Sequence, residues 1–142
     1  MLTIDRLELA AQLDRLVTLL PRLTPRGGLS MVAAATLADL ERQGPRRVTE
    51  LAETQGVTQP AMTGLVGRLE AGGLVERAPD PADRRGVLVT VTRDGRAVLA
   101  ARRRARAEAL ADLLDDLDAE DHAALAAAMG AVGRLVSKGT PA

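Results

Sequence analysis

Two arginines and two aspartates stand close together in the segment PDPADRRG, residues 79–86. Arginine is preferred in a narrow minor groove of DNA, because the negative potential is enhanced there. Asp83 is near enough in sequence to orient Arg85 through a bidentate carboxylate–guanidinium pair, which would leave Arg85 with less freedom to lose on binding. The alternative is a surface turn whose charges serve only solubility. The segment therefore predicts a loop that presents Arg84 and Arg85 to a nucleic acid.

A short helix is predicted upstream of this loop, from Gln59 to Glu70. Thr58 is a typical N-cap, and Pro60 is tolerated in the first turn because the N–H that it lacks would have no partner in the helix. A helical wheel places four residues on the core side: Ala61, Met62, Leu65 and Leu69. The opposite side carries Pro60, Thr63, Gly64 and Gly67, flanked by Gln59 and Arg68.

The outward face of this helix suits a DNA groove. Gln59 can pair with adenine and Thr63 can contact a thymine methyl group, whereas Arg68 either meets a phosphate or braces the loop. Each glycine inside a helix costs about 1 kcal/mol relative to alanine, so Gly64 and Gly67 indicate a close approach by another molecule. An unselected surface position is the alternative. The candidate DNA-contacting residues are Thr58, Gln59, Pro60, Thr63, Gly64, Arg68, Asp83, Arg84 and Arg85.

The elements around these residues predict a winged helix-turn-helix. A helix-turn-helix needs a small residue, a turn glycine and apolar core positions, and the chain offers Ala52, Gly56, Val57, Met62 and Leu65. Thr49 is expected to cap the first of the two helices. Strands are expected at 74–78 and 87–92, joined by the loop 79–86 as a hairpin. An ordinary pair of antiparallel helices is the alternative for the first half.

Apolar stripes at both ends of the chain predict a dimer. A helix over 3–23 carries Leu9, Leu13, Leu16, Leu20 and Leu23, and a final helix after Asp118 carries Leu125, Met129, Val132 and Val136. Neither stripe is needed by a compact winged helix, so we expect them to pack across a two-fold axis. The predicted interface residues are Leu9, Leu13, Leu16, Leu20, Leu125, Met129 and Val132.

The expected fold class is mainly α-helical. The predicted β-hairpin over 74–92, called the wing from here on, makes it α+β, and the whole forms one domain over 1–142. The DNA-binding lobe is expected at 30–95, with dimerisation helices at 3–23 and 97–137. A helix capped by Ser30 and running to about Gln43 opens the lobe, and a long helix capped by Thr92 follows the second strand.

Composition narrows the function further. The 142 residues have zero net charge, no cysteine, no aromatic residue and one histidine, which excludes disulfides, thiol chemistry and a multi-histidine metal site. The charge is segregated: residues 77–106 hold nine basic and three acidic side chains, and residues 107–121 hold seven acidic and no basic ones. Such a chain can present a basic face to phosphates, although solvated helix faces are an alternative. No apolar run is long enough to cross a membrane, so we expect a cytoplasmic protein.

Catalysis is not expected. The chain has two serines, Ser30 and Ser137, and one histidine, His122, so it has very few residues from which a nucleophilic triad could be built. The acidic residues of 107–121 lack the glycine and the terminal glutamate of a calcium loop. Neither a cofactor nor a metal is predicted.

The runs ELAETQGVTQPAMTGLVGRLEAGGLVER, DPADRRGVLVTVT and TRDGRAVL resemble the MarR (multiple antibiotic resistance regulator) family of winged-helix transcription factors. The resemblance covers nearly the whole chain, and Asp83 with Arg85 is its most specific element. It implies a homodimer that binds a pseudo-palindromic operator, usually as a repressor, and that small phenolic or lipophilic ligands often release.

Two departures limit what the resemblance implies. Without cysteine, sensing by thiol oxidation is excluded, and without aromatic residues any ligand pocket between the dimerisation helices and the lobe must be aliphatic. A winged helix used only for protein–protein interaction, and a nonspecific DNA-binding protein without a ligand response, remain as alternatives.

Overall fold

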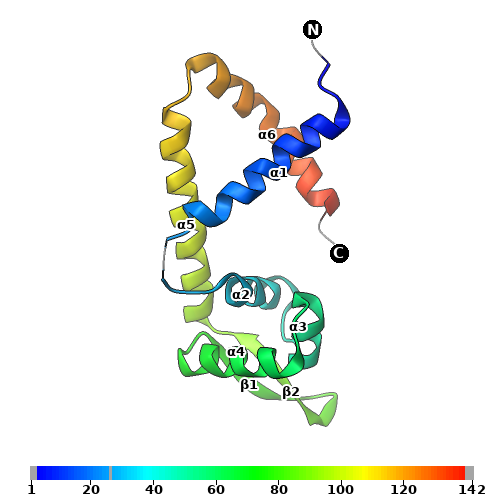
Figure 1. Cartoon of the computed structure of the whole chain (residues 1–142). Helices are drawn as coiled ribbons and strands as arrows, with labels where there is room; N and C mark the ends of the chain where they lie inside the picture. Colours follow the sequence, from blue (N-terminus) through cyan, green and yellow to red (C-terminus); the bar gives the residue numbers. More distant parts are fainter. Residues whose placement is uncertain (1–2, 26, 140–142) are drawn as a thin grey trace.

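The computed structural model describes residues 3–25 and 27–139. In this part of the chain six helices accompany a two-stranded antiparallel sheet (Figure 1). The elements are α1 (Arg6–Leu23), α2 (Met31–Gln43), α3 (Val48–Gln55), α4 (Gln59–Ala71), β1 (Val75–Asp80), β2 (Asp83–Val91), α5 (Arg93–Asp115) and α6 (Ala119–Gly139). The prediction of a mainly helical winged helix-turn-helix is confirmed.

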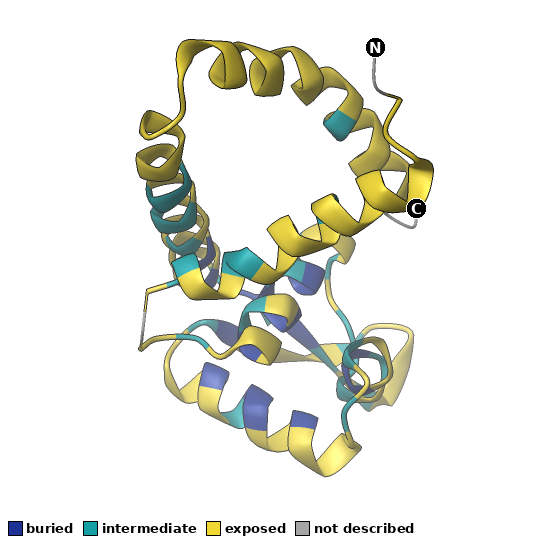
Figure 2. Cartoon of the chain, turned by 45° about the horizontal axis from the view of Figure 1, so that its top comes forward, coloured by how far each residue is buried: buried dark blue, intermediate teal, exposed yellow. Residues whose placement is uncertain are grey.

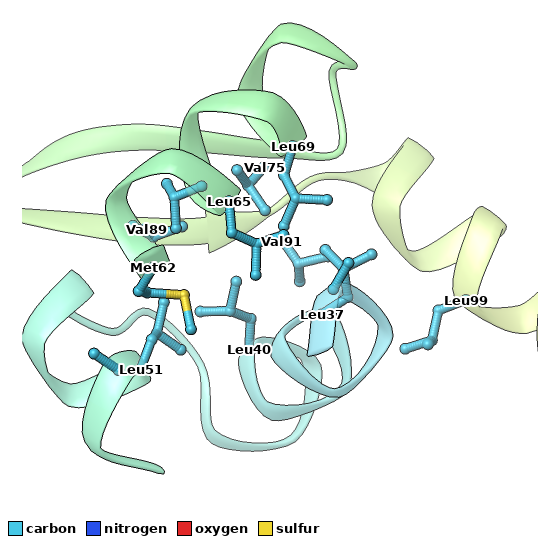
Figure 3. Packing of buried hydrophobic residues seen from close by; sticks show 13 residues of the cluster. Leu37, Leu40, Leu51, Met62, Leu65, Leu69, Val75, Val89, Val91 and Leu99 are labelled. Atoms are coloured by element: carbon cyan, nitrogen blue, oxygen red, sulfur yellow. The ribbon is translucent and has the colours of Figure 1, made fainter. Parts of the chain in front are cut away.

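Aliphatic burial holds the helix-turn-helix and the sheet together as one lobe. Leu37 of α2, Leu51 of α3 and Met62 of α4 are fully buried, and they belong to one cluster with Val89 of β2 (Figure 3). All buried apolar residues of this core lie between Ala33 and Leu99. The core therefore fixes α4 relative to the sheet.

The buried face of α4 differs by one residue from the helical-wheel prediction. Met62, Leu65 and Leu69 are buried as predicted, but Ala61 is exposed and Val66 is fully buried in its place. Positions 62, 65, 66 and 69 follow the i, i+3, i+4, i+7 spacing of a single helix face, whereas Ala61 lies in the first turn beyond the edge of that face.

Most predicted helix starts are confirmed by their caps. The hydroxyl groups of Ser30 and Thr92 accept the N–H groups of the third residue that follows each, at 3.1 Å in both cases. Asp118 accepts the N–H of Asp121 at 2.8 Å in the same way. The first helix begins at Arg6, three residues later than predicted.

The predicted cap at Thr49 is wrong. Helix α3 begins at Val48 with Arg47 as its N-cap residue. The carboxylate of Glu50, the third residue of the helix, accepts the N–H of the N-cap residue Arg47 at 3.4 Å, as the glutamate of a capping box does. At the other end, Gly56 adopts φ 65° in the turn between α3 and α4, as its type predicts.

The sheet extends further than predicted. The strands were expected at 74–78 and 87–92 with a loop over 79–86, but β1 and β2 are separated only by Pro81 and Ala82. Their pairing jumps from Pro79–Val87 to Asp80–Asp83, which leaves residues 84–86 of β2 without partners on β1. A third segment joins the sheet through one bridge, Arg46 to Val89, with N···O distances of 3.0 and 2.7 Å.

Three helices outside the lobe form an open frame. Helix α5 rises from the lobe, α6 turns back from its far end, and α1 meets α6 near the two chain ends in both views (Figures 1 and 2). Neither α1 nor α6 contains a buried residue. Among the described residues, no helix is both long enough and apolar enough to cross a membrane.

A glycine pair tests how tightly α5 is joined to the lobe. A Cβ added at Gly95 would overlap the carbonyl oxygen of Leu74, whereas a Cβ at Gly67 meets nothing within 4 Å. We predict that Gly95→Ala lowers the free energy of unfolding by about 1–3 kcal/mol through overpacking. Gly67→Ala is expected to raise it by up to about 1 kcal/mol through helix propensity. Urea titration at one fixed protein concentration measures both, and an unaffected Gly95→Ala variant would contradict the close packing.

Candidate nucleic-acid interface

Helix α4 presents one polar face to solvent. Its N-cap Thr58 accepts the N–H of Ala61 at 3.3 Å, as predicted. All six candidate residues of this helix and its cap are exposed: Thr58, Gln59, Pro60, Thr63, Gly64 and Arg68. The sequence analysis therefore placed this face correctly.

Arg68 lies along the helix rather than against the wing. Its Nη1 is 3.5 Å from the position that a Cβ of residue 64 would take, so the guanidinium lies over the bare backbone of Gly64. Within the described ranges its guanidinium makes no hydrogen bond or ion pair. The wing is therefore not braced by Arg68 in this structure, and its cation is available on the α4 face.

The wing arginines follow the turn and do not form its tip. Arg84 and Arg85 lie in the unpaired part of β2, directly after the two-residue turn. Both side chains are exposed, and neither guanidinium is paired within residues 3–25 and 27–139. Two unpaired cations therefore stand beside the turn, in strand β2 and not in the loop in which they were predicted.

The predicted side-chain pair between Asp83 and Arg85 is not present. Asp83 Oδ1 accepts the backbone N–H of Arg85 at 3.0 Å, and Asp83 Oδ2 accepts Arg47 Nη2 at 3.3 Å. The carboxylate thus shapes the backbone at Arg85 and leaves its guanidinium unpaired. Asp83 instead pairs with a cation that precedes it by 36 residues.

Arg47 and Asp80 are the residues that sequence reasoning missed. Asp80 Oδ2 accepts Arg47 Nη2 at 2.7 Å and Nε at 3.2 Å, and its side chain is only 11% exposed. The hydrogen bond from Arg47 is the main reason why the pKa of Asp80 lies below its ordinary value of 3.8. The same bond raises the pKa of Arg47. No local signal connects positions 33 residues apart, so only the folded sheet reveals this pair.

The predicted dimer residues lie on the open frame. Leu9, Leu16, Leu125 and Met129 are exposed in the single chain, and Leu13, Leu20 and Val132 are half-buried. An aliphatic cavity of about 520 Å³ lies between α1, α5 and α6. Its lining includes Leu16, Leu20, Leu125, Met129 and His122. The structure thus leaves these side chains available without showing what covers them.

Comparison with known proteins identifies the family. The model of the MarR family matches residues 27–86. An HTH-type transcriptional regulator of Mycobacterium bovis is 34% identical over 114 residues, which cover 80% of each chain. This chain belongs to the MarR family of transcriptional regulators. The repressor NicR of Pseudomonas putida is 41% identical over 71 residues, half of this chain and 45% of that protein.

Solved structures agree with this assignment over 92% of the chain. A transcriptional regulator of Thermotoga maritima has 27% identity and a TM-score of 0.71, with 92% of both chains covered. Wild-type MarR of Escherichia coli has 25% identity and a TM-score of 0.63, covering 92% of this chain and 98% of MarR. The winged helix and the flanking helices together are therefore those of a MarR-family, DNA-binding regulator.

Not every arginine of the basic run faces outward in this MarR-family chain. Arg102 donates to the carbonyl of Leu29 at 3.0 Å, and Arg103 pairs with Glu41 at 2.8 Å. These contacts join α5 to the segment that precedes α2 and to the last turn of α2. Part of the charge segregation is therefore structural, and the wing carries two of the arginines that stay unpaired among the described residues, Arg84 and Arg85.

The Arg47–Asp80 pair predicts an acid-sensitive contribution to stability. The pKa of Asp80 is lowered on folding, so the pair stabilises the native state above pH 3.8 and loses this effect as the pH falls through the lower folded value. The Asp80→Asn variant has no carboxylate at position 80 and therefore lacks the stabilisation that the ion pair provides. We therefore expect wild type to be more stable than Asp80→Asn at neutral pH, with a difference that shrinks below pH 3.8. Urea titrations along a pH series measure it.

Asp112→Asn is the matched control, because Asp112 is exposed and has no partner among the described residues. Its difference from wild type is expected to stay small throughout the series. A gap between wild type and Asp80→Asn that persisted unchanged in acid would contradict the ionic origin of the effect.

Proposed function

We propose that the protein is a homodimeric, sequence-specific repressor of a pseudo-palindromic operator. The observation that carries the proposal is the exposure of both the polar face of α4 and the unpaired cations of the wing. Gln59 and Thr63 read base edges in the major groove, and Thr58, Pro60 and Gly64 allow the first turns of α4 to approach closely. Arg68 contacts a phosphate, and Arg84 and Arg85 enter the adjacent minor groove.

A two-fold dimer gives this surface its geometry. Leu9, Leu13, Leu16 and Leu20 of one copy pack with Leu125, Met129 and Val132 of the other, which removes the exposed aliphatic surface from water. The two α4 helices then lie about one DNA turn apart or a multiple of it, so that the operator repeats as the protein does.

Repression is the proposed sense of regulation. Similar proteins act in both senses: NicR of Pseudomonas putida is a repressor, and BadR of Rhodopseudomonas palustris, 47% identical over 51 residues, is a transcriptional activatory protein. In vitro transcription from a promoter that overlaps the bound site is expected to fall when the protein is added. A rise in transcript would contradict repression and leave DNA binding in place.

A small apolar ligand is the proposed signal. A cavity of about 230 Å³ lies between the α1–α2 connection and α5, lined mainly by Pro25, Leu29, Val98, Ala101 and Ala105 with Arg102 at its side. Occupation would change how α5 sits on the lobe and therefore how far apart the two α4 helices stand. A panel of small aliphatic compounds is expected to contain one that both raises the melting temperature and releases DNA, effects that Ala101→Leu removes by filling the cavity. Compounds that left both quantities unchanged would contradict the proposed signal.

Arg85→Ala tests the DNA interface. The variant is expected to lose about 1–3 kcal/mol of binding free energy and to show a shallower dependence of affinity on salt. Fluorescence anisotropy with a duplex enriched from a random pool by the wild-type protein measures both quantities. Arg104→Ala is the control, since Arg104 is exposed on α5 and pairs with Glu108 at 2.9 Å within its own helix. Equal affinities for wild type and Arg85→Ala would remove the wing from the mechanism.

Light scattering at micromolar concentration tests the dimer. The wild-type protein is expected at twice its chain mass of 14.9 kDa, and Leu125→Asp is expected to shift toward the monomer because a carboxylate would be buried in an aliphatic interface. Met31→Ser replaces an exposed apolar side chain outside α1 and α6 (66% exposed, against 43% for Leu125) and should leave the mass unchanged. A wild-type monomer would refute the dimer.

A further inference from the structure

We propose that Arg47 is a positioning residue for DNA binding: it locks the tip of the wing onto the start of α3, so that the wing arginines and α4 approach DNA as one rigid surface. This role rests on the proposed function. Arg47 acts through the wing and does not itself contact DNA.

The wing contacts the residues that precede α3 at two points along the hairpin, one near its base and one toward its tip. Near its base, the backbone of Arg46 forms a two-hydrogen-bond bridge with Val89 of β2. Toward its tip, the side chain of the next residue, Arg47, reaches both carboxylates that flank the turn, Asp80 and Asp83. Consecutive residues at the start of α3 thus hold the two ends of the same hairpin.

Each carboxylate divides its two oxygens between the turn and Arg47. Asp80 Oδ1 accepts the N–H of Ala82 at 2.9 Å, and Asp83 Oδ1 accepts the N–H of Arg85 at 3.0 Å. The other oxygen of each carboxylate accepts from Arg47. The guanidinium therefore fixes the two side chains that in turn fix the backbone at the turn and at Arg85.

Gly86 provides the space for this contact. A Cβ at position 86 would lie 2.9 Å from Arg47 Nη2, 3.0 Å from its Cζ and 3.2 Å from the Cβ of Asp80. These distances are shorter than ordinary van der Waals contacts. The absence of a Cβ at residue 86 therefore leaves room for the guanidinium of Arg47 beside Asp80. A larger residue at position 86 would displace the side chain of Arg47.

The wing needs such a contact because little else holds its tip. Residues 84–86 have no partner on β1, and the residues from Glu76 to Pro79 are exposed. A two-stranded hairpin is only marginally stable alone. Without Arg47, the ordering of the wing would have to accompany DNA binding, and each side chain immobilised on binding reduces affinity about two- to tenfold.

Arg47→Lys tests the role while retaining the positive charge. Lysine lacks the planar fork that bonds two carboxylates at once, so the variant should bind the enriched duplex three- to tenfold more weakly, on the order expected for lost preorganisation. Arg46→Lys is the matched control: the neighbouring guanidinium bonds Glu50 and Gln43 and does not touch the wing. Its affinity should remain within about twofold of wild type.

The same substitution in an Arg84→Ala/Arg85→Ala background separates positioning from direct contact. A residue that acts through the wing has nothing left to position, so Arg47→Lys should then have no further effect. An equal loss in both backgrounds would overturn the proposal, as would wild-type affinity for Arg47→Lys alone.

Amide hydrogen exchange supplies a readout that does not involve DNA. The N–H groups of Ala82 and Arg85 should exchange faster in Arg47→Lys than in wild type and in Arg46→Lys, and unchanged rates would contradict the lock. If Arg47→Lys fails to fold, Asp80→Asn tests the same contact from the wing side. A wild-type protein that bound no duplex would contradict the proposed function and this role together, whereas a failure confined to the Arg47 variants would contradict this role alone.

Discussion

Aliphatic burial is distributed unevenly along this chain, and the rest of the structure follows from that. Without any aromatic residue, the core must be assembled from leucine, valine, methionine and alanine, and all of its buried members lie between Ala33 and Leu99. Helices α1 and α6 bury nothing by themselves although both carry aliphatic stripes. A single chain therefore forms the core of the lobe and leaves α1 and α6 without buried residues. We propose that a second copy covers these helices, and the proposed function depends on it.

The lobe itself has a rigid part and a part that needs support. Leu37, Leu51, Met62 and Val89 fix α4 on the sheet by full burial. The wing extends beyond this core, and its exposed strands are held by hydrogen bonds and by the Arg47 ion pairs. Polar contacts thus set the position of the wing where apolar packing cannot reach. Acid weakens such contacts and leaves the apolar core unaffected. The stability of the wing and that of α4 should therefore respond differently to pH.

The sequence predicted what local chemistry governs. Capping residues such as Ser30, Thr58 and Thr92 and the turn at Gly56 follow from hydrogen bonding and backbone conformation within a few residues, and the structure confirms them. The outward face of α4 followed from helical periodicity. The pairing of Asp83 was predicted with a near neighbour in sequence, whereas the fold brings it to Arg47, because strand β2 passes the start of α3. The length of the wing strands was also missed, since a turn with two prolines near it resembles a longer loop until the register is known.

The proposed function requires that two copies of this lobe read one operator. Sequencing the duplexes that the wild-type protein retains from a random pool tests it most directly. This requirement predicts an inverted repeat whose half-sites are separated by about one helical turn, roughly 10 base pairs, or a multiple of it. A retained pool without an enriched sequence, or one enriched in a single half-site without its inverted copy, would contradict it.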